Sequence, residues 1–144
     1  IGAESVGASP EDVLAAKKFG QNIGIIFQIR DDIFDYYNSD EIGKPTGNDM
    51  IDGKLTLPAI YALNSTNNEE MRAIARKIKA HEISSDEIAK LVEFTKQNGG
   101  IDYAEKRMWD FHSECMNFLE SKVANAEIRK SLTAYIDYVI KRKL

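Results

Sequence analysis

The sequence predicts an all-α protein, and three observations lead to this fold class. Residues that typically start helices open several segments: Ser9 stands before Pro10, and Ser84 stands three residues before Glu87. No segment alternates apolar and polar residues for long enough to form a strand. Stretches that contain glycine or asparagine separate the segments from one another. We therefore expect a helical bundle.

We expect the first helix to run from Pro10 to about Tyr37. Ser9 caps it, Pro10 occupies the first helical position, and two acids follow in the first turn. Gly20 and Gly24 would let another helix approach closely, or are simply two tolerated glycines. Apolar residues cover so much of the circumference that we expect burial on several sides; they are Val13, Leu14, Phe19, Ile23, Ile26, Phe27, Ile29, Ile33 and Phe34.

Beyond the first helix, residues 38–53 are polar and contain glycine and proline, which predicts a loop. Loops of this length are uncommon in compact domains unless they carry a function. Pro58 follows the loop and is tolerated near the first turn of the next helix. We expect five further helices at about residues 55–63, 68–81, 84–98, 101–124 and 127–143.

The size and composition indicate one globular domain. A chain of 144 residues can bury about two thirds of the surface that its unfolded form exposes. It has 43% hydrophobic and 29% charged residues, a balance that argues against disorder. The net charge of −4 is mild and the basic residues are scattered, so we expect no nucleic-acid partner. The longest uncharged run, residues 19–29, is shorter than the roughly 18 apolar residues that a membrane span requires.

The single cysteine and the first residues bear on the cellular setting. Cys115 cannot form an internal disulfide, and the start of the chain lacks the order of a signal peptide, so we expect a reducing cytoplasm. The chain opens at Ile1 without an initiator methionine, which we interpret as the start of a fragment. His112 and Cys115 lie three apart and could ligate zinc, but two further ligands are not apparent. We expect ordinary packing for both.

Three aspartates lie in the last part of the first helix, within FQIRDDIFDYY at residues 27–37. Asp31 and Asp35 are four apart and share one face, with Asp32 beside them. Low helix propensity, repulsion between like charges and the negative end of the helix dipole together cost about 2 to 3 kcal/mol. A solvated acidic face would explain them, but the flanking Phe27 and Ile33 indicate a helix that is not freely solvated, where carboxylates need a partner.

Magnesium with a phosphate group would supply that partner. Mg²⁺ prefers oxygen ligands and is usually completed by water and substrate phosphates. In the following loop, Lys44 offers a mobile ammonium group and Asp49 a further carboxylate. Glycines at positions 43, 47 and 53 let the backbone come close to an anion. Taken alone, GKPTGND could be a flexible surface turn; after DDIFD, it favours an anion site.

The combination resembles the second aspartate-rich region of the trans-type isoprenyl diphosphate synthases. The residues that carry the resemblance form four linked blocks, GQNIG at 20–24, FQIRDDIFD at 27–35, GKPTGND at 43–49 and GKLTLP at 53–58. The tail, from Gly99-Gly100 onward, is similar to the closing helices of the polyprenyl branch. The resemblance covers the whole chain but only the C-terminal half of an isoprenoid synthase fold, because the first aspartate-rich motif of the family is absent.

The resemblance implies a prenyltransferase. Members of the family use Mg²⁺ to remove diphosphate from an allylic diphosphate; isopentenyl diphosphate attacks the resulting cation, and loss of a proton gives a polyprenyl diphosphate. By the resemblance, Asp31, Asp32 and Asp35 act in catalysis and ligate or orient Mg²⁺. Asp49 joins the network of metal and water.

The resemblance also assigns substrate-binding residues. Lys44 would bind the allylic diphosphate and act in catalysis, Gln28 would face the reacting carbons, and Lys54 would support the loop. A terpene cyclase of the same class and a noncatalytic subunit of a heteromeric synthase are alternatives. Without the N-terminal helices, the first helix would expose a large apolar face, so we expect a homodimer or other self-association and no activity from the fragment alone.

Overall fold

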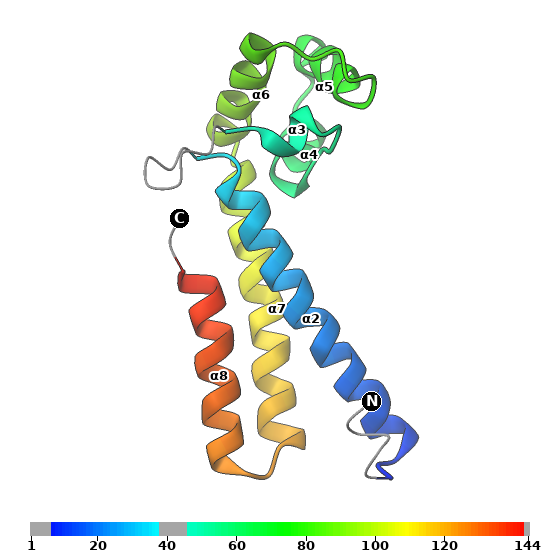
Figure 1. Ribbon diagram of the computed structural model, residues 1–144, viewed down its shortest axis with the longest axis vertical. Helices are drawn as coiled ribbons and strands as arrows, with labels where there is room; N and C mark the ends of the chain where they lie inside the picture. Colours follow the sequence, from blue (N-terminus) through cyan, green and yellow to red (C-terminus); the bar gives the residue numbers. More distant parts are fainter. Residues whose placement is uncertain (1–6, 38–45, 143–144) are drawn as a thin grey trace. The chain divides into compact units, whose positions relative to one another are not determined.

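The computed structural model describes residues 7–37 and 46–142, and all regular structure in these two ranges is helical. The predicted fold class, all-α, is therefore confirmed. The helices are shown in Figure 1 and are α2 (Pro10–Phe34), α3 (Asn48–Ile51), α4 (Leu57–Asn64), α5 (Glu69–Lys79), α6 (Ser85–Gln97), α7 (Gly100–Lys122) and α8 (Ala126–Lys141).

The predicted helices all form, with small changes at their ends. Helix α2 ends at Phe34, three residues before the expected end at Tyr37. The prediction that residues 38–53 are entirely a loop is wrong, because the short helix α3 lies within them. Pro58 lies in the first turn of α4, as expected, and the capping box of Ser84 and Glu87 opens α6. Residues 38–45 lie outside the described part of the chain.

The chain divides into two compact units. The first unit combines Ile1–Gln28 with Arg107–Lys143, and the second is Ile29–Lys106 with the last residue. Helices α2 and α7 each contribute to both units. No helix in the described ranges is long and apolar enough to cross a membrane.

In the first unit, parts of α2 and α7 pack with α8. The Phe19 and Phe118 rings stack with their centroids 4.5 Å apart, joining α2 to α7. The side-chain amide of Asn22 on α2 donates a hydrogen bond to Glu114 Oε2 on α7 at 2.9 Å. The core of this unit is formed by Ile26, Met108, Cys115, Leu119, Ile136, Val139 and Ile140.

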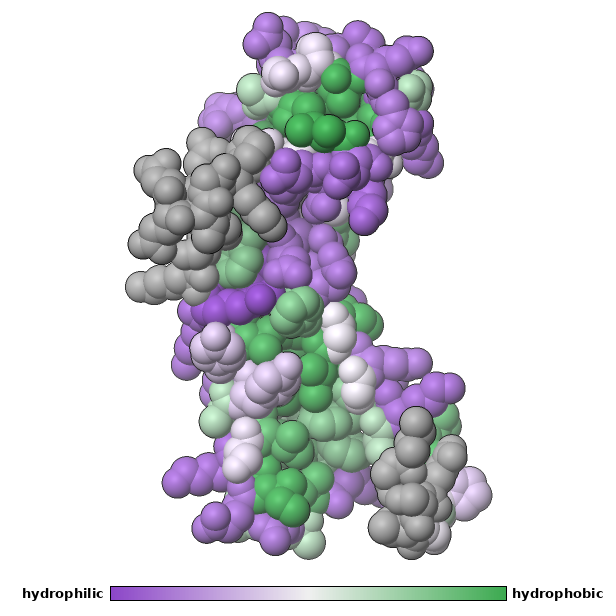
Figure 2. Space-filling view, viewed as in Figure 1, coloured by the Kyte–Doolittle hydropathy of each residue, from purple (hydrophilic) through white to green (hydrophobic). Residues whose placement is uncertain are grey.

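Several large apolar side chains of the first unit remain exposed. Leu14 and Tyr138 are each 68% exposed, and Phe27 is 42% exposed. The expectation that Leu14 and Phe27 are buried is therefore wrong. A Cβ atom added at Gly20 or Gly24 would meet nothing within 4 Å, so no described segment approaches α2 closely there. Figure 2 shows that apolar side chains gather on the displayed face of this unit.

In the second unit, α6 contacts both α4 and α5. Gly100, at the start of α7, approaches α4 so closely that an added Cβ would collide with the Pro58 carbonyl. The Tyr61 and Tyr103 rings stack nearby with their centroids 4.1 Å apart. The apolar core of this unit includes Ala59, Ala62, Leu63, Met71, Ile74, Ile78, Ile88, Leu91 and Val92. This core supports the end of α2 and the helix α3, where the candidate site lies.

Candidate functional site

The three predicted aspartates lie at the end of α2 in the second unit. Asp31 is half-buried and Asp32 is buried, at 9% exposure. Asp35 lies just beyond the last helical residue, yet its N–H donates to the Asp31 carbonyl at 3.2 Å, which continues the helical pattern. Neighbouring Ile33 is 2% exposed, so this end of α2 is anchored in the core. The structure therefore brings carboxylates to a partly buried position, as expected.

The carboxylate of Asp35 binds the beginning of α3. Its Oδ1 accepts a hydrogen bond from the N–H of Asn48, and its Oδ2 accepts one from the N–H of Asp49, both at 3.0 Å. The N–H of Gly47 donates to the Asp35 carbonyl at 2.8 Å. Because the first N–H groups of a helix have no partner within the helix, Asp35 supplies the cap of α3 from 13 and 14 residues away.

Gly47 makes this arrangement possible. Its φ of 80° is in the left-handed region, and it occupies the N-cap position of α3 without a side chain to cap the helix. An added Cβ would collide with the side chain of Ile88 on α6. Glycine is required here both for backbone conformation and for close packing.

Asp49 completes the acidic group. Burial raises the pKa of the Asp49 carboxyl, and the negative charge of Asp35 raises it further, whereas the Lys54 ammonium opposes the shift. The charges of Asp52 and Asp31 also raise the pKa of Asp49, so its carboxylate lies in an excess of negative charge. A cation bound near these carboxylates would relieve that excess.

Tyr36 links the end of α2 to the start of α4. Its side chain is 2% exposed, and its hydroxyl lies 3.0 Å from the Thr56 hydroxyl, within the GKLTLP block. Burial raises the pKa of Tyr36 to about 12, so the phenol stays neutral at physiological pH. The last two blocks of the predicted motif are therefore tied to the aspartate-rich turn through both Asp35 and Tyr36.

The remaining predicted site residues are Gln28, Lys54 and Lys44. Gln28 is exposed on α2 and belongs to the first unit. Lys54 is exposed, and its backbone N–H donates to the Asp49 carbonyl at 2.7 Å. Lys44 lies outside the described residues.

Among residues 7–37 and 46–142, no group of three or more His, Cys, Asp or Glu side chains is gathered so as to hold a metal ion alone. Mg²⁺ characteristically uses one or two protein carboxylates and takes its other ligands from water and phosphate. The chemistry of the acidic turn, with oxygen donors in negative surplus, fits such an ion when a substrate completes its coordination. The Asp31, Asp32, Asp35 and Asp49 metal set stays a prediction.

Two cations to which the sequence analysis assigned no role pack against aromatic rings at the end of α2. The Arg30 guanidinium lies 4.7 Å from the centroid of the Phe34 ring and 3.8 Å from a carboxylate oxygen of Glu105 on α7. The Lys96 ammonium lies 4.4 Å from the centroid of the Tyr37 ring. Arg30 lies one helical turn before Phe34 on the same face of α2, a spacing that the sequence contains, whereas Lys96 comes from α6, far along the chain from Tyr37.

His112 and Cys115 have packing roles, as expected. His112 Nε2 lies 2.8 Å from Asp137 Oδ1, which joins α7 to α8. Cys115 is fully buried, and burial raises the pKa of its thiol to about 11.

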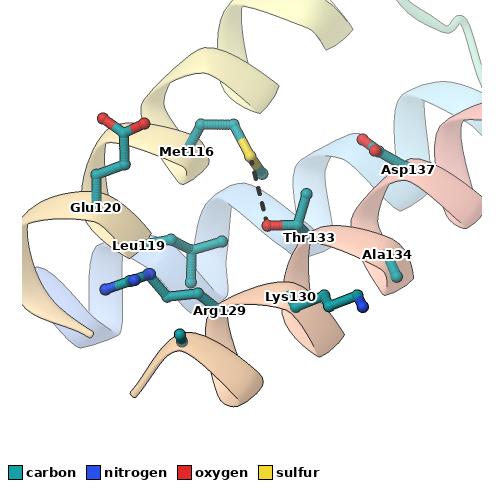
Figure 3. Close-up of a pocket in the computed structure, with 9 residues that line it drawn as sticks. Met116, Leu119, Glu120, Arg129, Lys130, Thr133, Ala134 and Asp137 are labelled. Carbon is teal, nitrogen blue, oxygen red and sulfur yellow. Dashed lines mark hydrogen bonds between the residues drawn. The ribbon is translucent and has the colours of Figure 1, made fainter. Parts of the chain in front are cut away.

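A groove of about 580 Å³ between the C-terminal part of α7 and α8 lies in the first unit (Figure 3). The Thr133 hydroxyl faces the Met116 sulfur across it at 3.9 Å. Its lining carries both signs of charge, from Glu120, Arg129, Lys130 and Asp137. Because it contains none of the predicted site residues, we do not assign it to the candidate site.

Residues 1–95, which include the aspartate-rich turn, the following loop and the GKLTLP block, match the family described as Polyprenyl synthetase. The chain belongs to this family. The predicted resemblance is therefore confirmed.

Relatives of this polyprenyl synthetase chain are isoprenyl diphosphate synthases. A geranylfarnesyl diphosphate synthase of Aeropyrum pernix is 33% identical over 145 residues, which cover 99% of this chain and 44% of that protein. The chain thus spans less than half the length of this relative.

Solved structures show the isoprenoid synthase fold. A geranylgeranyl pyrophosphate synthase from Bacteroides thetaiotaomicron has a TM-score of 0.90 and 47% identity, covering 97% of this chain and 46% of that one. A geranylgeranyl pyrophosphate synthase from Corynebacterium glutamicum, complexed with isoprenyl diphosphate and magnesium, has a TM-score of 0.76 and 28% identity, covering 95% and 39%.

Proposed function

We propose that the protein is the C-terminal part of a single polyprenyl synthase domain, whose complete form condenses isopentenyl diphosphate with an allylic diphosphate to make a polyprenyl diphosphate. The observation that carries the proposal is the acidic turn at Asp31 and Asp32, set beside Asp49 by the Asp35 contacts, within the part of the chain that matches the family. The synthase names of the relatives support the reaction class.

Asp31 and Asp32 would hold Mg²⁺, with Asp49 acting through bound water. The magnesium-bound relative from Corynebacterium glutamicum supports the choice of metal. When bound, the ion would neutralise charge on the departing diphosphate. The carboxylates would orient the ion and keep it at the end of α2, because the buried Ile33 and Tyr36 fix that turn in the core.

The substrates would be held by the basic and polar residues around this turn. Lys44 would bind the allylic diphosphate as a point charge. Lys54, whose backbone N–H donates a hydrogen bond to the Asp49 carbonyl, would keep the loop in place. Gln28 would contact the substrate near the reacting carbons.

The remaining helices, with the first aspartate-rich motif of the family, would come from a further part of the protein. We propose that this chain alone does not catalyse condensation and that it self-associates through the exposed apolar side chains of the first unit. The complete enzyme would act in the cytoplasm.

The test is condensation of labelled isopentenyl diphosphate by the complete protein. We expect Mg²⁺-dependent product, and loss of about 100-fold or more in kcat/KM for Asp31→Asn, because removal of electrostatic stabilisation typically costs that much. Asp86→Asn, which removes the same charge from an exposed position on α6, serves as the control. A complete protein that neither forms product nor binds an allylic diphosphate with Mg²⁺ would overturn the proposal.

A further inference from the structure

Asp35 is the third member of the acidic motif, and its contacts differ from those expected of a metal ligand. Each of its two carboxylate oxygens accepts a backbone N–H, from Asn48 and from Asp49, at 3.0 Å. Its carbonyl accepts a third, from Gly47 at 2.8 Å. Three consecutive backbone N–H groups thus converge on one residue.

These bonds satisfy N–H groups that have no acceptor within α3 itself. The N–H groups of Asn48 and Asp49 belong to the first turn, and the first bond along the helix runs from the Ile51 N–H to the Gly47 carbonyl. Gly47 has no side chain with which to cap them. Hydrogen bonds from N–H groups to an ionised carboxylate are about twice as strong as neutral ones, so Asp35 is an effective replacement for the missing cap.

The same bonds determine where Asp49 lies. Its backbone is fixed to Asp35, and its carboxyl is close enough to Asp35 and Asp31 to feel both charges. Without the Asp35 contacts, the four-residue helix α3 would keep only one turn of its own hydrogen bonds. Short helices of this kind are marginal in water.

We propose that Asp35 is a positioning residue that caps α3 and thereby holds Asp49 beside the metal-binding turn, while Asp31 and Asp32 supply the direct ligands. This inference rests on the proposed function for its catalytic consequence. Its structural consequence can be measured without any substrate.

The first experiment is hydrogen exchange of the Asn48 and Asp49 amides in the metal-free chain. Asp35→Ala removes both acceptors, so we expect both amides to exchange about tenfold faster or more. Asp35→Asn keeps one oxygen acceptor and should give an intermediate increase. Asp52→Asn removes a carboxylate from the other end of α3 and should leave both rates unchanged. Unchanged exchange in Asp35→Ala would overturn the proposal.

The second experiment asks whether Asp35 acts through Asp49. In the complete enzyme we expect Asp35→Asn to lower kcat/KM about tenfold, but less than twofold when Asp49→Asn is already present, since residues that act as a unit are not additive. A structural role of Asp35 that is independent of Asp49 predicts the same loss in both backgrounds, and that result would overturn the proposal.

The two experiments separate this inference from the proposed function. If the complete wild-type protein makes no product while Asp35→Ala still frees the two amides, the synthase assignment fails. In that case the cap stands, and the proposed positioning of a catalytic metal site is overturned with the assignment. If product forms normally and the exchange rates do not move, the inference alone fails.

Discussion

At the scale of single residues, the candidate site depends on a few positions whose chemistry admits no close substitute. Gly47 has a left-handed backbone and leaves no room for a Cβ beside Ile88. Asp35 has both carboxylate oxygens on backbone N–H groups of the next element. Each residue is small or charged for a local reason that can be tested separately from catalysis.

Replacing Gly47 by alanine should destabilise the chain by about 2 kcal/mol or more, because the left-handed conformation and the contact with Ile88 both penalise a side chain. The free energy of unfolding in urea measures the effect. Gly24→Ala is the matched control, since Gly24 lies within α2 with nothing within 4 Å of an added Cβ. There we expect a gain of about 1 kcal/mol from helix propensity. Changes of the same sign at both glycines would contradict this interpretation.

At the scale of elements, hydrogen bonds near the helix ends decide where each helix starts. Ser84 and Glu87 form a reciprocal capping box at the start of α6. The Glu87 carboxylate also binds the Lys77 ammonium of α5 at 2.6 Å. One acidic residue therefore caps its own helix and joins it to the preceding one.

The pairing of Glu87 predicts a pH dependence of stability. The hydrogen bond from Lys77 is the largest of the effects that lower the pKa of Glu87 from its usual value of 4.5. Because the folded pKa lies below the unfolded one, the ionised carboxylate stabilises the fold above pH 4.5, and this contribution is lost as the pH falls through the folded pKa.

Glu87→Gln should therefore be less stable than wild type at pH 7, with a difference that shrinks below pH 4.5. Urea unfolding at several pH values measures it. The exposed neighbour Glu82 provides the control, because Glu82→Gln should follow the wild-type curve. A difference between Glu87→Gln and wild type that is constant across the pH range would show that charge is not the cause.

The sequence was informative about elements wherever a helix start is encoded locally. Asn68, Ser84 and Pro58 lie within three residues of the N–H groups or first turns that they serve, and the helices they open were predicted. The helix α3 was missed, because four residues are too few for a periodic pattern. Its cap is also supplied from outside the local window, by Asp35. The one local signal was Gly47 directly before Asn48 and Asp49.

The residues of the candidate site could be predicted from the sequence, but the different contacts of each aspartate could not. The carboxylates and their spacing were readable from DDIFD, and the structure gathers Asp31, Asp32 and Asp35 at one turn. Which of them accepts backbone hydrogen bonds depends on how residues 47–49 fold back against the end of α2. That position depends on the packing of Gly47 against Ile88 of α6, which cannot be predicted from the spacing of residues in the sequence.

At the scale of the whole molecule, the chain spans less than half the length of its relatives and leaves large apolar side chains exposed in its first unit. Leu14 is 68% exposed on α2, where burial was expected. Apolar surface of this kind favours association because contact removes it from water.

We therefore expect the sedimentation coefficient of the isolated chain to rise with protein concentration. Leu14→Gln should weaken the association, whereas Lys17→Gln, an exposed change on the same helix, should have little effect. Sedimentation velocity over a wide concentration range provides the measurement. A strictly monomeric profile at high concentration would exclude self-association.

The buried Cys115 gives the molecule an internal reporter. It is the only thiol in the sequence, it is enclosed in the core of the first unit, and its pKa of about 11 leaves very little thiolate at neutral pH. Alkylating reagents attack the thiolate, so modification must wait until α7 and its neighbours separate. The rate of alkylation therefore reports how often that core opens, and no labelled position has to be engineered.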